Sequence, residues 1–256
     1  MRYKFTLKLV DQLRNILPVN YQFELGSWFY RMLNTTGSPL HNHLVSSGHL
    51  NKDKPFKNFV FSHLSVPDRK IASDRLLIQC ERVSLIFSTF PDPDLVPLVT
   101  SNFLDTRFML GDKLSQVPFH VEKVEKIPEP EFTDKMTFRT ISPIHLSAKI
   151  PGRKNELHLS PEDDSYTGYF YENLQQKYSL LFGHAHPHEP VAGKFKLRSE
   201  VTQKGITINT GTSGQSKLIG YQLRFRLQTD PDLIRSGYYL GFGEKNHLGF
   251  GCCENL

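Results

Sequence analysis

The segment Pro128–Phe132, with the sequence PEPEF, is a stiff and polar break that divides the chain into two halves of about 125 residues each. A chain of 256 residues is too long for one small module and suits two domains of ordinary size. Hydrophobic residues make up 38% of the chain and aromatic residues 12%, which is enough for packed cores and excludes a disordered chain. We therefore expect one domain over residues 1–127 and a second over residues 128–256.

The first half contains alternating strand and helix patterns. Apolar residues recur with a period of two in Met1–Val10 and with a helical period in Pro18–Leu33. The patterns that follow predict, in order, the strands Asn58–Val66 and Arg82–Phe90, the short helix Asp92–Phe103 and the strand Phe119–Ile127. The order strand, helix, strand, strand, helix, strand is that of a ferredoxin-like domain.

The second half repeats this order more loosely. The patterns predict an extended segment Thr137–Ile150, a helix Pro161–Tyr178, strands Lys194–Val201 and Lys217–Gln228, a short helix Pro231–Ser236 and a last strand after Gly249. The predicted fold class is therefore α+β, with two tandem ferredoxin-like (RRM-like) βαββαβ domains.

The composition limits where the protein is expected to reside and which partners and cofactors it is expected to bind. No stretch approaches the roughly 20 apolar residues that a membrane span requires, so we expect a cytoplasmic protein. The 31 Lys and Arg exceed the 26 Asp and Glu by five, which permits an anionic partner without requiring one. The cysteines, Cys80, Cys252 and Cys253, have neither a disulfide pattern nor zinc-site spacing, and we expect no cofactor.

Three alternating histidines, His184, His186 and His188, form the sequence HAHPH. Alternating imidazoles on one face of a strand could bind zinc or nickel. The proline within the motif and the flanking Gly183 favour an exposed loop between a helix and a strand instead. We predict the loop and no metal site.

The most specific segment is the C-terminal sequence GYYLGFGEKNHLGFG, Gly237 to Gly251. Glycine-rich loops allow backbone N–H groups to approach a phosphate closely, although this one lacks both the Walker A and the dinucleotide-binding pattern. A simple connecting loop is the alternative. The residues predicted to contact a phosphate-bearing ligand here are Gly241, Gly243, Lys245, Asn246, His247, Gly249 and Gly251.

Basic residues alternate along two predicted strands. Lys194, Lys196 and Arg198 fall on one face of the first strand, and Arg224 and Arg226 share a face of the second. Each charge taken alone is more typical of a solvated surface than of a contact. Together they predict a surface that can follow a phosphate backbone.

Several segments resemble the CRISPR repeat-processing endoribonucleases (Cas type six) of the RAMP superfamily. GFGEKNHLGFG is similar to their glycine-rich loop, and the resemblance extends over essentially the whole chain. The other matching segments, in order, are LPVNYQFELGSWFY (Leu17–Tyr30), KNFVFSHL (Lys57–Leu64), KIASDRLLI (Lys70–Ile78), TFRTISPI (Thr137–Ile144) and LQQKY (Leu174–Tyr178).

The resemblance implies metal-independent cleavage of precursor CRISPR RNA by attack of a ribose 2′-OH, giving 2′,3′-cyclic phosphate and 5′-OH ends. Such chemistry needs a base, an acid and a cation at the phosphate. The family's tyrosine and lysine fall on Tyr30 and Lys57, but its histidine position falls on Val45. If Pro39–Ser47 is helical, His41 lies one turn earlier on the same face, and His49 lies one turn beyond.

The acid is therefore assigned first to His41 and next to His49, with Lys52 or Lys54 as alternatives. The departure at Val45 leaves a catalytically inactive repeat-RNA-binding protein as the alternative function. A structural subunit of a CRISPR effector complex is a third reading. The expected partner is repeat RNA, with an effector complex as a further candidate, and the chain is expected to be a monomer or homodimer.

Overall fold

The computed structural model describes residues 1–47, 57–149, 152, 156–187, 193–208 and 215–256. Its contacts divide the chain into two compact units. The first unit consists of Met1–Asn58, His63–Phe87 and Pro91–Pro128, and the second of Phe59–Ser62, Ser88–Phe90 and Glu129–Leu256. Two short segments from the N-terminal half therefore belong to the second unit.

The first unit contains antiparallel strands in the order β6-β1-β8-β7. Their bounds are β1 Arg2–Leu9, β6 Arg82–Ser88, β7 Arg107–Gly111 and β8 Gln116–Lys126. Residues of β1 alternate between buried and more exposed positions, as the sequence pattern predicts. Tyr3, Phe5 and Leu7 thereby face the core.

Three helices accompany this sheet, α1 Gln22–Leu33, α2 Pro39–Ser46 and α3 Leu95–Phe103. Aromatic rings fill the space between α1, α3 and the strands. Phe5 makes edge contacts with Phe29 of α1, Phe87 of β6 and Phe103 of α3, at centroid distances of 5.7, 5.8 and 5.3 Å. Helices α1 and α3 therefore cover one face of the sheet.

A further three-stranded sheet, in the order β2-β5-β4, belongs to the first unit and was not predicted. Its strands are β2 Ile16–Pro18, β4 Arg69–Ala72 and β5 Arg75–Ile78. A tight turn joins β4 to β5, with Ser73 at a φ of 54°. The segment Lys70–Ile78, one of those that carry the family resemblance, forms most of this hairpin.

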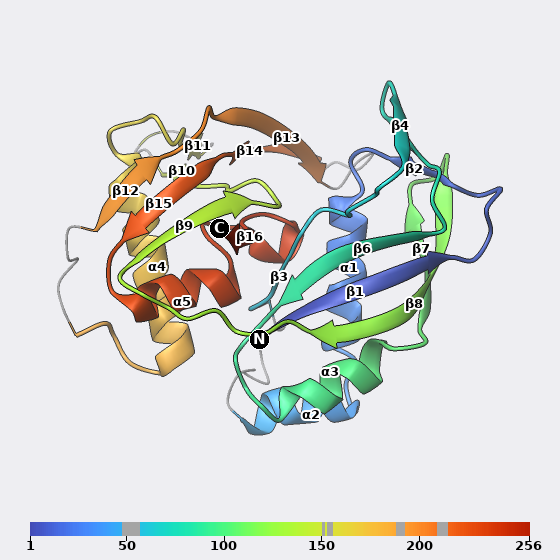
Figure 1. Ribbon diagram of the computed structural model, residues 1–256, viewed down its shortest axis with the longest axis horizontal. Coiled ribbons are helices and arrows are strands. Elements are labelled where there is room, and N and C mark those ends of the chain that lie inside the picture. Colours follow the sequence, from blue (N-terminus) through green and yellow to red (C-terminus); the bar gives the residue numbers. More distant parts are fainter. Residues whose placement is uncertain (48–56, 150–151, 153–155, 188–192, 209–214) are drawn as a thin grey trace. The chain divides into compact units, whose positions relative to one another are not determined.

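The second unit has a four-stranded sheet in the order β12-β15-β9-β16. Its strands are β9 Lys135–Thr140, β12 Lys194–Leu197, β15 Arg224–Gln228 and β16 Cys253–Asn255. Adjacent strands are antiparallel throughout. Two helices, α4 Tyr166–Phe182 and α5 Pro231–Leu240, lie together beside this sheet (Figure 1).

Phe170 of α4 is the centre of the second core. It is fully buried and stacks on Phe242 at 5.9 Å, while its other ring contacts include Phe195 and Phe225 of the sheet. Apolar residues of β9, β12 and β15 face these helices, so their alternate residues form the opposite face. The element order β9, α4, β12, β15, α5, β16 is ferredoxin-like, as predicted.

Further elements complete the second unit. They are β3 Val60–Phe61, β10 Ser147–Ala148, β11 Leu157–His158, β13 Thr202–Ile208, β14 Ser216–Gln222 and the 3-10 helix η1 Asn246–Leu248. The β13–β14 hairpin, drawn in brown and orange, extends beyond the main sheet (Figure 1). In the described parts of the chain, no helix is both long and apolar enough to cross a membrane.

Some helix boundaries differ from the sequence predictions. The predicted helix Pro18–Leu33 begins at Gln22, because Pro18 pairs with Arg75 in a strand. The predicted helix Pro161–Tyr178 begins at Tyr166, whose N–H donates to Asp163 in a preceding turn. It then runs on to Phe182 and stops at Gly183, whose positive φ of 77° ends the helix.

Some predicted strands are shorter or interrupted, whereas the predicted strand Phe119–Ile127 begins earlier, at Gln116, and ends at Lys126. Asn58–Val66 contains only the two-residue strand Val60–Phe61. Lys217–Gln228 is split at Leu223, whose N–H donates to the hydroxyl of Thr140. The last predicted helix, in contrast, is longer than expected and ends at Leu240, so Gly237 is helical and is not part of a loop.

Candidate functional site

Positively charged side chains gather on the solvent face of the second unit's sheet. The strand register places Lys196 opposite Arg226, and Arg224 opposite Arg139, on the face turned away from the core. We call this surface the basic face and define it by Lys135, Arg139, Lys194, Lys196, Arg198, Arg224 and Arg226. Most of these residues are exposed.

Few carboxylates neutralise the basic face. Arg139 pairs with Glu254, and Arg226 donates to the Thr137 hydroxyl at 3.2 Å. For the remaining cations, no carboxylate of the described residues lies within ion-pair distance. Neighbouring strands are about 4.8 Å apart and alternate residues about 7 Å apart, so this face is a grid of positive charge.

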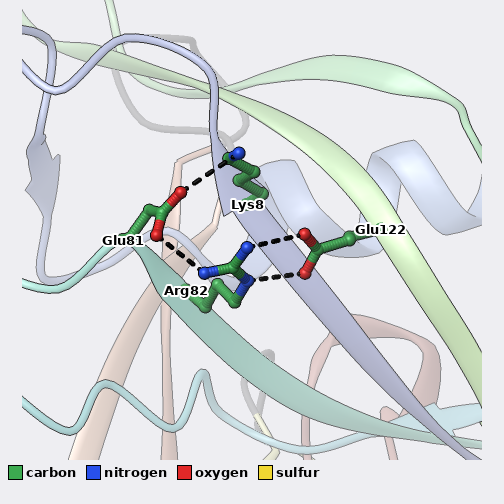
Figure 2. Close-up of polar contacts among 4 residues, drawn as sticks. All are labelled: Lys8, Glu81, Arg82 and Glu122. Carbon is green, nitrogen blue, oxygen red and sulfur yellow. Dashed lines mark hydrogen bonds and ion pairs between the residues drawn. The ribbon is translucent and has the colours of Figure 1, made fainter.

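On the sheet of the first unit, the face turned away from the core differs from the basic face, because its positive charges are paired with carboxylates. Figure 2 shows Lys8, Glu81, Arg82 and Glu122 in one connected network. Arg82 binds both oxygens of Glu122 at 2.7 and 2.9 Å, and Glu81 accepts from Arg82 at 2.7 Å and pairs with Lys8 at 3.1 Å. Because these charges cancel within the network, this part of the first sheet offers little attraction to an anion.

The basic face includes cations that the sequence reading did not emphasise. β9 has the sequence KMTFRT, in which Lys135 and Arg139 alternate with the buried Met136 and Phe138. The same period of two that identified Lys194 and Lys196 is present here. That alternation is the signal that would have placed Lys135 on the same face.

The glycine-rich segment is a buried turn. We call residues Gly241–Gly251 the glycine-rich turn. Gly241, Gly243, Gly249 and Gly251 are all buried, with φ values between 75° and 88°. A Cβ at Gly251 would collide with the carbonyl oxygen of Phe242, and one at Gly243 would collide with that of His145. The glycines are therefore required for close packing of the backbone.

Several backbone amides of this turn donate hydrogen bonds within the protein. Phe242 N–H donates to Gly251 at 2.8 Å, Glu244 N–H to His145 at 2.7 Å, and Gly251 N–H to Pro143 at 2.7 Å. The side-chain amide of Asn246 likewise donates to Phe250 at 3.0 Å. These donors are therefore occupied within the protein, whereas the side chains of Lys245 and His247 are half-buried.

β3 lies beside the glycine-rich turn. The rings of Phe59 and His247 meet edge to face at 6.5 Å, and β3 contacts η1. The segment Phe59–Ser62 and the glycine-rich turn, far apart in sequence, therefore pack together within the second unit.

The first two catalytic candidates lie on helices of the first unit. Tyr30 is on α1 and is half-buried, whereas its neighbours Trp28 and Phe29 are buried in the core. His41 is on α2, where its backbone N–H donates to the hydroxyl of Ser38, the N-cap residue of the helix, at 3.1 Å. The ring nitrogen Nδ1 of His41 is buried and has no hydrogen-bond partner among the described residues.

The remaining positions considered for catalysis lie on α2 or after it in the chain. Val45 is half-buried and lies one turn after His41, as the helical prediction requires. His43 contacts Asp92 through Nε2 at 2.7 Å, an ion pair when the ring is protonated. Lys57 is exposed, while His49, Lys52 and Lys54 lie outside the described residues. Where the chain is described, no hydrogen bond connects Tyr30, His41 and Lys57.

The HAHPH segment has a packing role in its described part. His186 and His184 both pack edge to face against Tyr178 of α4, at 4.8 and 5.6 Å. His186 also lies 3.5 Å from a carboxylate oxygen of Asp230. No group of three potential metal ligands occurs in the described portions of the chain, and His188 lies outside them.

Comparison with known proteins identifies the class. The family model for the C-terminal part of the CRISPR-associated protein Cas6 matches residues 127–255. A solved structure described as an RAMP protein binding different RNA substrates superposes with a TM-score of 0.81 and 24% identity, covering 100% of this chain and 99% of its own. The chain is thus a CRISPR-associated protein with two ferredoxin-like units.

Curated relatives narrow the class further. The chain is 26% identical to the CRISPR-associated endoribonuclease Cas6 1 of Methanocaldococcus jannaschii, over 100% of this chain and 94% of the relative. It is 27% identical to the endoribonuclease-like protein Cas6nc of Pyrococcus horikoshii, over 92% of each. The protein belongs to the Cas6 family.

Proposed function

We propose that this chain is an endoribonuclease that binds the repeat RNA of CRISPR transcripts and cuts it. The observation that carries the proposal is the basic face, a grid of largely unneutralised cations on an open sheet. Such a surface attracts a phosphate backbone without reading its sequence. Curated relatives that are named as endoribonucleases support the cleavage step.

The proposed reaction needs no metal ion. A base removes the proton of a ribose 2′-OH, and the 2′-oxygen attacks the adjacent phosphorus in line. The bond from phosphorus to the 5′-oxygen breaks, and an acid gives that oxygen a proton, leaving 2′,3′-cyclic phosphate and 5′-OH ends. In this scheme Tyr30 orients or deprotonates the 2′-OH, and Lys57 stabilises the negative charge of the transition state.

His41 is the proposed acid. Imidazole exchanges a proton near neutral pH, and α2 holds His41 one turn from Val45, the position where the family has its histidine. His43 is a poorer candidate because Asp92 engages its ring. His49, Lys52 and Lys54 remain alternative acids.

An inactive RNA-binding protein of the same family is the second candidate function. Val45 motivates it, because an aliphatic side chain cannot transfer a proton. The relative named endoribonuclease-like, rather than endoribonuclease, supports keeping this candidate.

Single-turnover cleavage separates the two candidates. The wild-type protein is mixed in excess with an RNA copy of the CRISPR repeat of its source organism, in EDTA, and the product ends are identified. We expect a cyclic-phosphate product and a rate that falls roughly 100-fold or more in His41→Ala. His43→Ala, on the same helix, is the matched control and should stay within a few-fold. Tight binding with no product would establish the inactive candidate, and a loss confined to His49→Ala would move the acid to His49.

Salt dependence of affinity tests the basic face. Replacing Lys194 and Lys196 together with alanine should weaken binding to every RNA and reduce the slope of log K against log salt by about 0.7 per lost phosphate contact. Lys8→Ala is the matched control, because Glu81 already neutralises that lysine. Equal losses in the two proteins would contradict this placement of the RNA.

The remaining parts of the proposal concern organisation. We propose that repeat RNA is the partner, that residues 1–127 and 128–256 act as the two domains, and that the protein is a monomer or a homodimer.

A further inference from the structure

Lys177 is a buried charged residue with no role in the proposed chemistry. It lies on α4 and exposes only 6% of its surface. Its ammonium donates hydrogen bonds to the carbonyl oxygens of Gly241 and Gly243, the first two glycines of the glycine-rich turn. Burying a charge is costly unless other groups compensate it, so this contact restrains the turn strongly.

Charge and hydrogen bonds compensate for the burial of Lys177. Burial lowers the pKa of Lys177 to about 7, while the negative potential of Glu244 and Cys253 opposes that shift. The carboxylate of Glu244 also accepts a hydrogen bond from the Ser147 hydroxyl at 2.8 Å and lies 3.9 Å from Nε2 of His145. Glu244 is thus held by two hydrogen bonds: its carboxylate accepts from Ser147 of β10, and its backbone N–H donates to the carbonyl of His145.

The residue after Glu244 carries backbone strain. Lys245 has a φ of 55°, in the left-handed region that a lysine rarely adopts. Strain of this kind persists only where the surroundings enforce it, and it occurs often at functional sites. Here the enforcing contacts are those of Gly243 and Glu244, which precede Lys245 directly.

We propose that Lys177 is a positioning residue for RNA binding, which holds the glycine-rich turn so that the side chain of Lys245 meets the phosphate backbone. This inference rests on the proposed function. Lys177 itself touches no RNA, because its ammonium is enclosed by the two glycine carbonyls. Its effect on affinity passes through Lys245.

Hydrogen exchange tests, in the absence of RNA, whether Lys177 restrains the glycine-rich turn. Lys177→Met keeps an unbranched side chain one atom shorter and removes both hydrogen bonds, and Gln176→Met changes the neighbouring exposed residue of the same helix. We expect the amides of the glycine-rich turn to exchange at least tenfold faster in Lys177→Met than in Gln176→Met. Equal protection in both variants would overturn the inference, whatever the RNA results. If Lys177→Met does not fold, Lys177→Gln replaces it, because its amide is neutral and can still donate to one carbonyl.

A double-mutant cycle tests the link to RNA, with the labelled repeat RNA as probe. We expect Lys245→Ala and Lys177→Met each to lower affinity about fivefold and to reduce the salt slope by about 0.7. Because both act through one contact, the double variant should bind like Lys245→Ala alone. Additive losses, or an unchanged salt slope in Lys177→Met, would show that Lys177 acts only on general stability. If the wild-type protein binds no repeat RNA, the proposed function is wrong. The exchange result would still show whether Lys177 restrains the glycine-rich turn.

Discussion

Two glycines with nearly the same positive φ allow the packing of the glycine-rich turn to be measured. Gly251 and Gly183 have φ values of 80° and 77°, so alanine would adopt an unfavourable positive φ at both. At Gly183, which ends α4, a Cβ would meet nothing within 4 Å. At Gly251 it would collide with the carbonyl oxygen of Phe242, which is backbone and cannot rotate away. The difference between the two variants therefore isolates the steric term.

The expected magnitudes follow from these contacts. The left-handed conformation costs an alanine about 1–2 kcal/mol, which is the whole effect at Gly183. At Gly251 the collision also disrupts the hydrogen bond from Phe242 N–H to Gly251, and the bond from Gly251 N–H to Pro143 is strained. Each disrupted buried hydrogen bond costs about 1–3 kcal/mol. We expect Gly251→Ala to cost about 3 kcal/mol more than Gly183→Ala.

Thermal unfolding measures this difference. For a chain of this size 1 kcal/mol shifts Tm by about 2–4 °C, so Gly183→Ala should lower Tm by about 4 °C and Gly251→Ala by about 13 °C. Circular dichroism and calorimetry on the same samples give Tm and show whether one transition or two are involved. If the two variants melt together, the buried, close-packed turn described here is wrong.

Three further predictions concern stability. Phe170→Ala should cost about 3–5 kcal/mol in urea unfolding, whereas the half-exposed neighbour Tyr169 should tolerate alanine; equal costs would contradict the position of the core. Ser38→Ala should cost about 1 kcal/mol because it removes the cap of α2, and an unchanged denaturation midpoint would refute that contact. Hydrogen bonds from Arg82 hold the pKa of Glu122 below its usual value, so its contribution to stability is complete above about pH 4.5 and is lost as pH falls through the lower, folded-state pKa. Between pH 6 and pH 3 the Tm of Glu122→Gln should therefore fall less than that of the wild type, and parallel curves would count against the network.

The order of the main strands and helices was predictable because these elements have a clear period. β1 alternates strictly, and α4 carries Phe170 and Leu174 at helical spacing, so both patterns predicted the right type of element, although the bounds of α4 differ from those expected. Element ends were less predictable, because they depend on distant partners. Pro18 was expected to begin a helix, yet it pairs with Arg75, more than 50 residues away.

The glycine-rich turn shows a deeper limit of sequence reasoning. Its composition is the same whether the glycines expose backbone amides to a phosphate or bring backbone segments into contact. Only the structure shows that Gly243 packs against His145 and that the amide of Glu244 is occupied. Lys177 had a signal, since it follows Leu174 by three residues on the buried stripe of α4, where a lysine is unexpected.

The catalytic candidates could be proposed from spacing but not ranked. The helix α2 confirms that His41 and Val45 are one turn apart. The contact between His43 and Asp92 joins residues 49 positions apart, which no local pattern contains.

The membership of Phe59–Ser62 in the second unit affects how the protein folds during synthesis and how it can be divided. The second unit is assembled from pieces that leave the ribosome at very different times, because β3 is made well before Gly241 and His247, with which it packs. Phe59 and Val60, both buried, must therefore wait for the last residues of the chain before they are covered. A fragment beginning at Glu129 would lack Phe59–Ser62 and would expose the surface of the glycine-rich turn against which these residues pack. Exchange of whole C-terminal halves between relatives would consequently succeed only if residues 59–62 and 88–90 are exchanged with them.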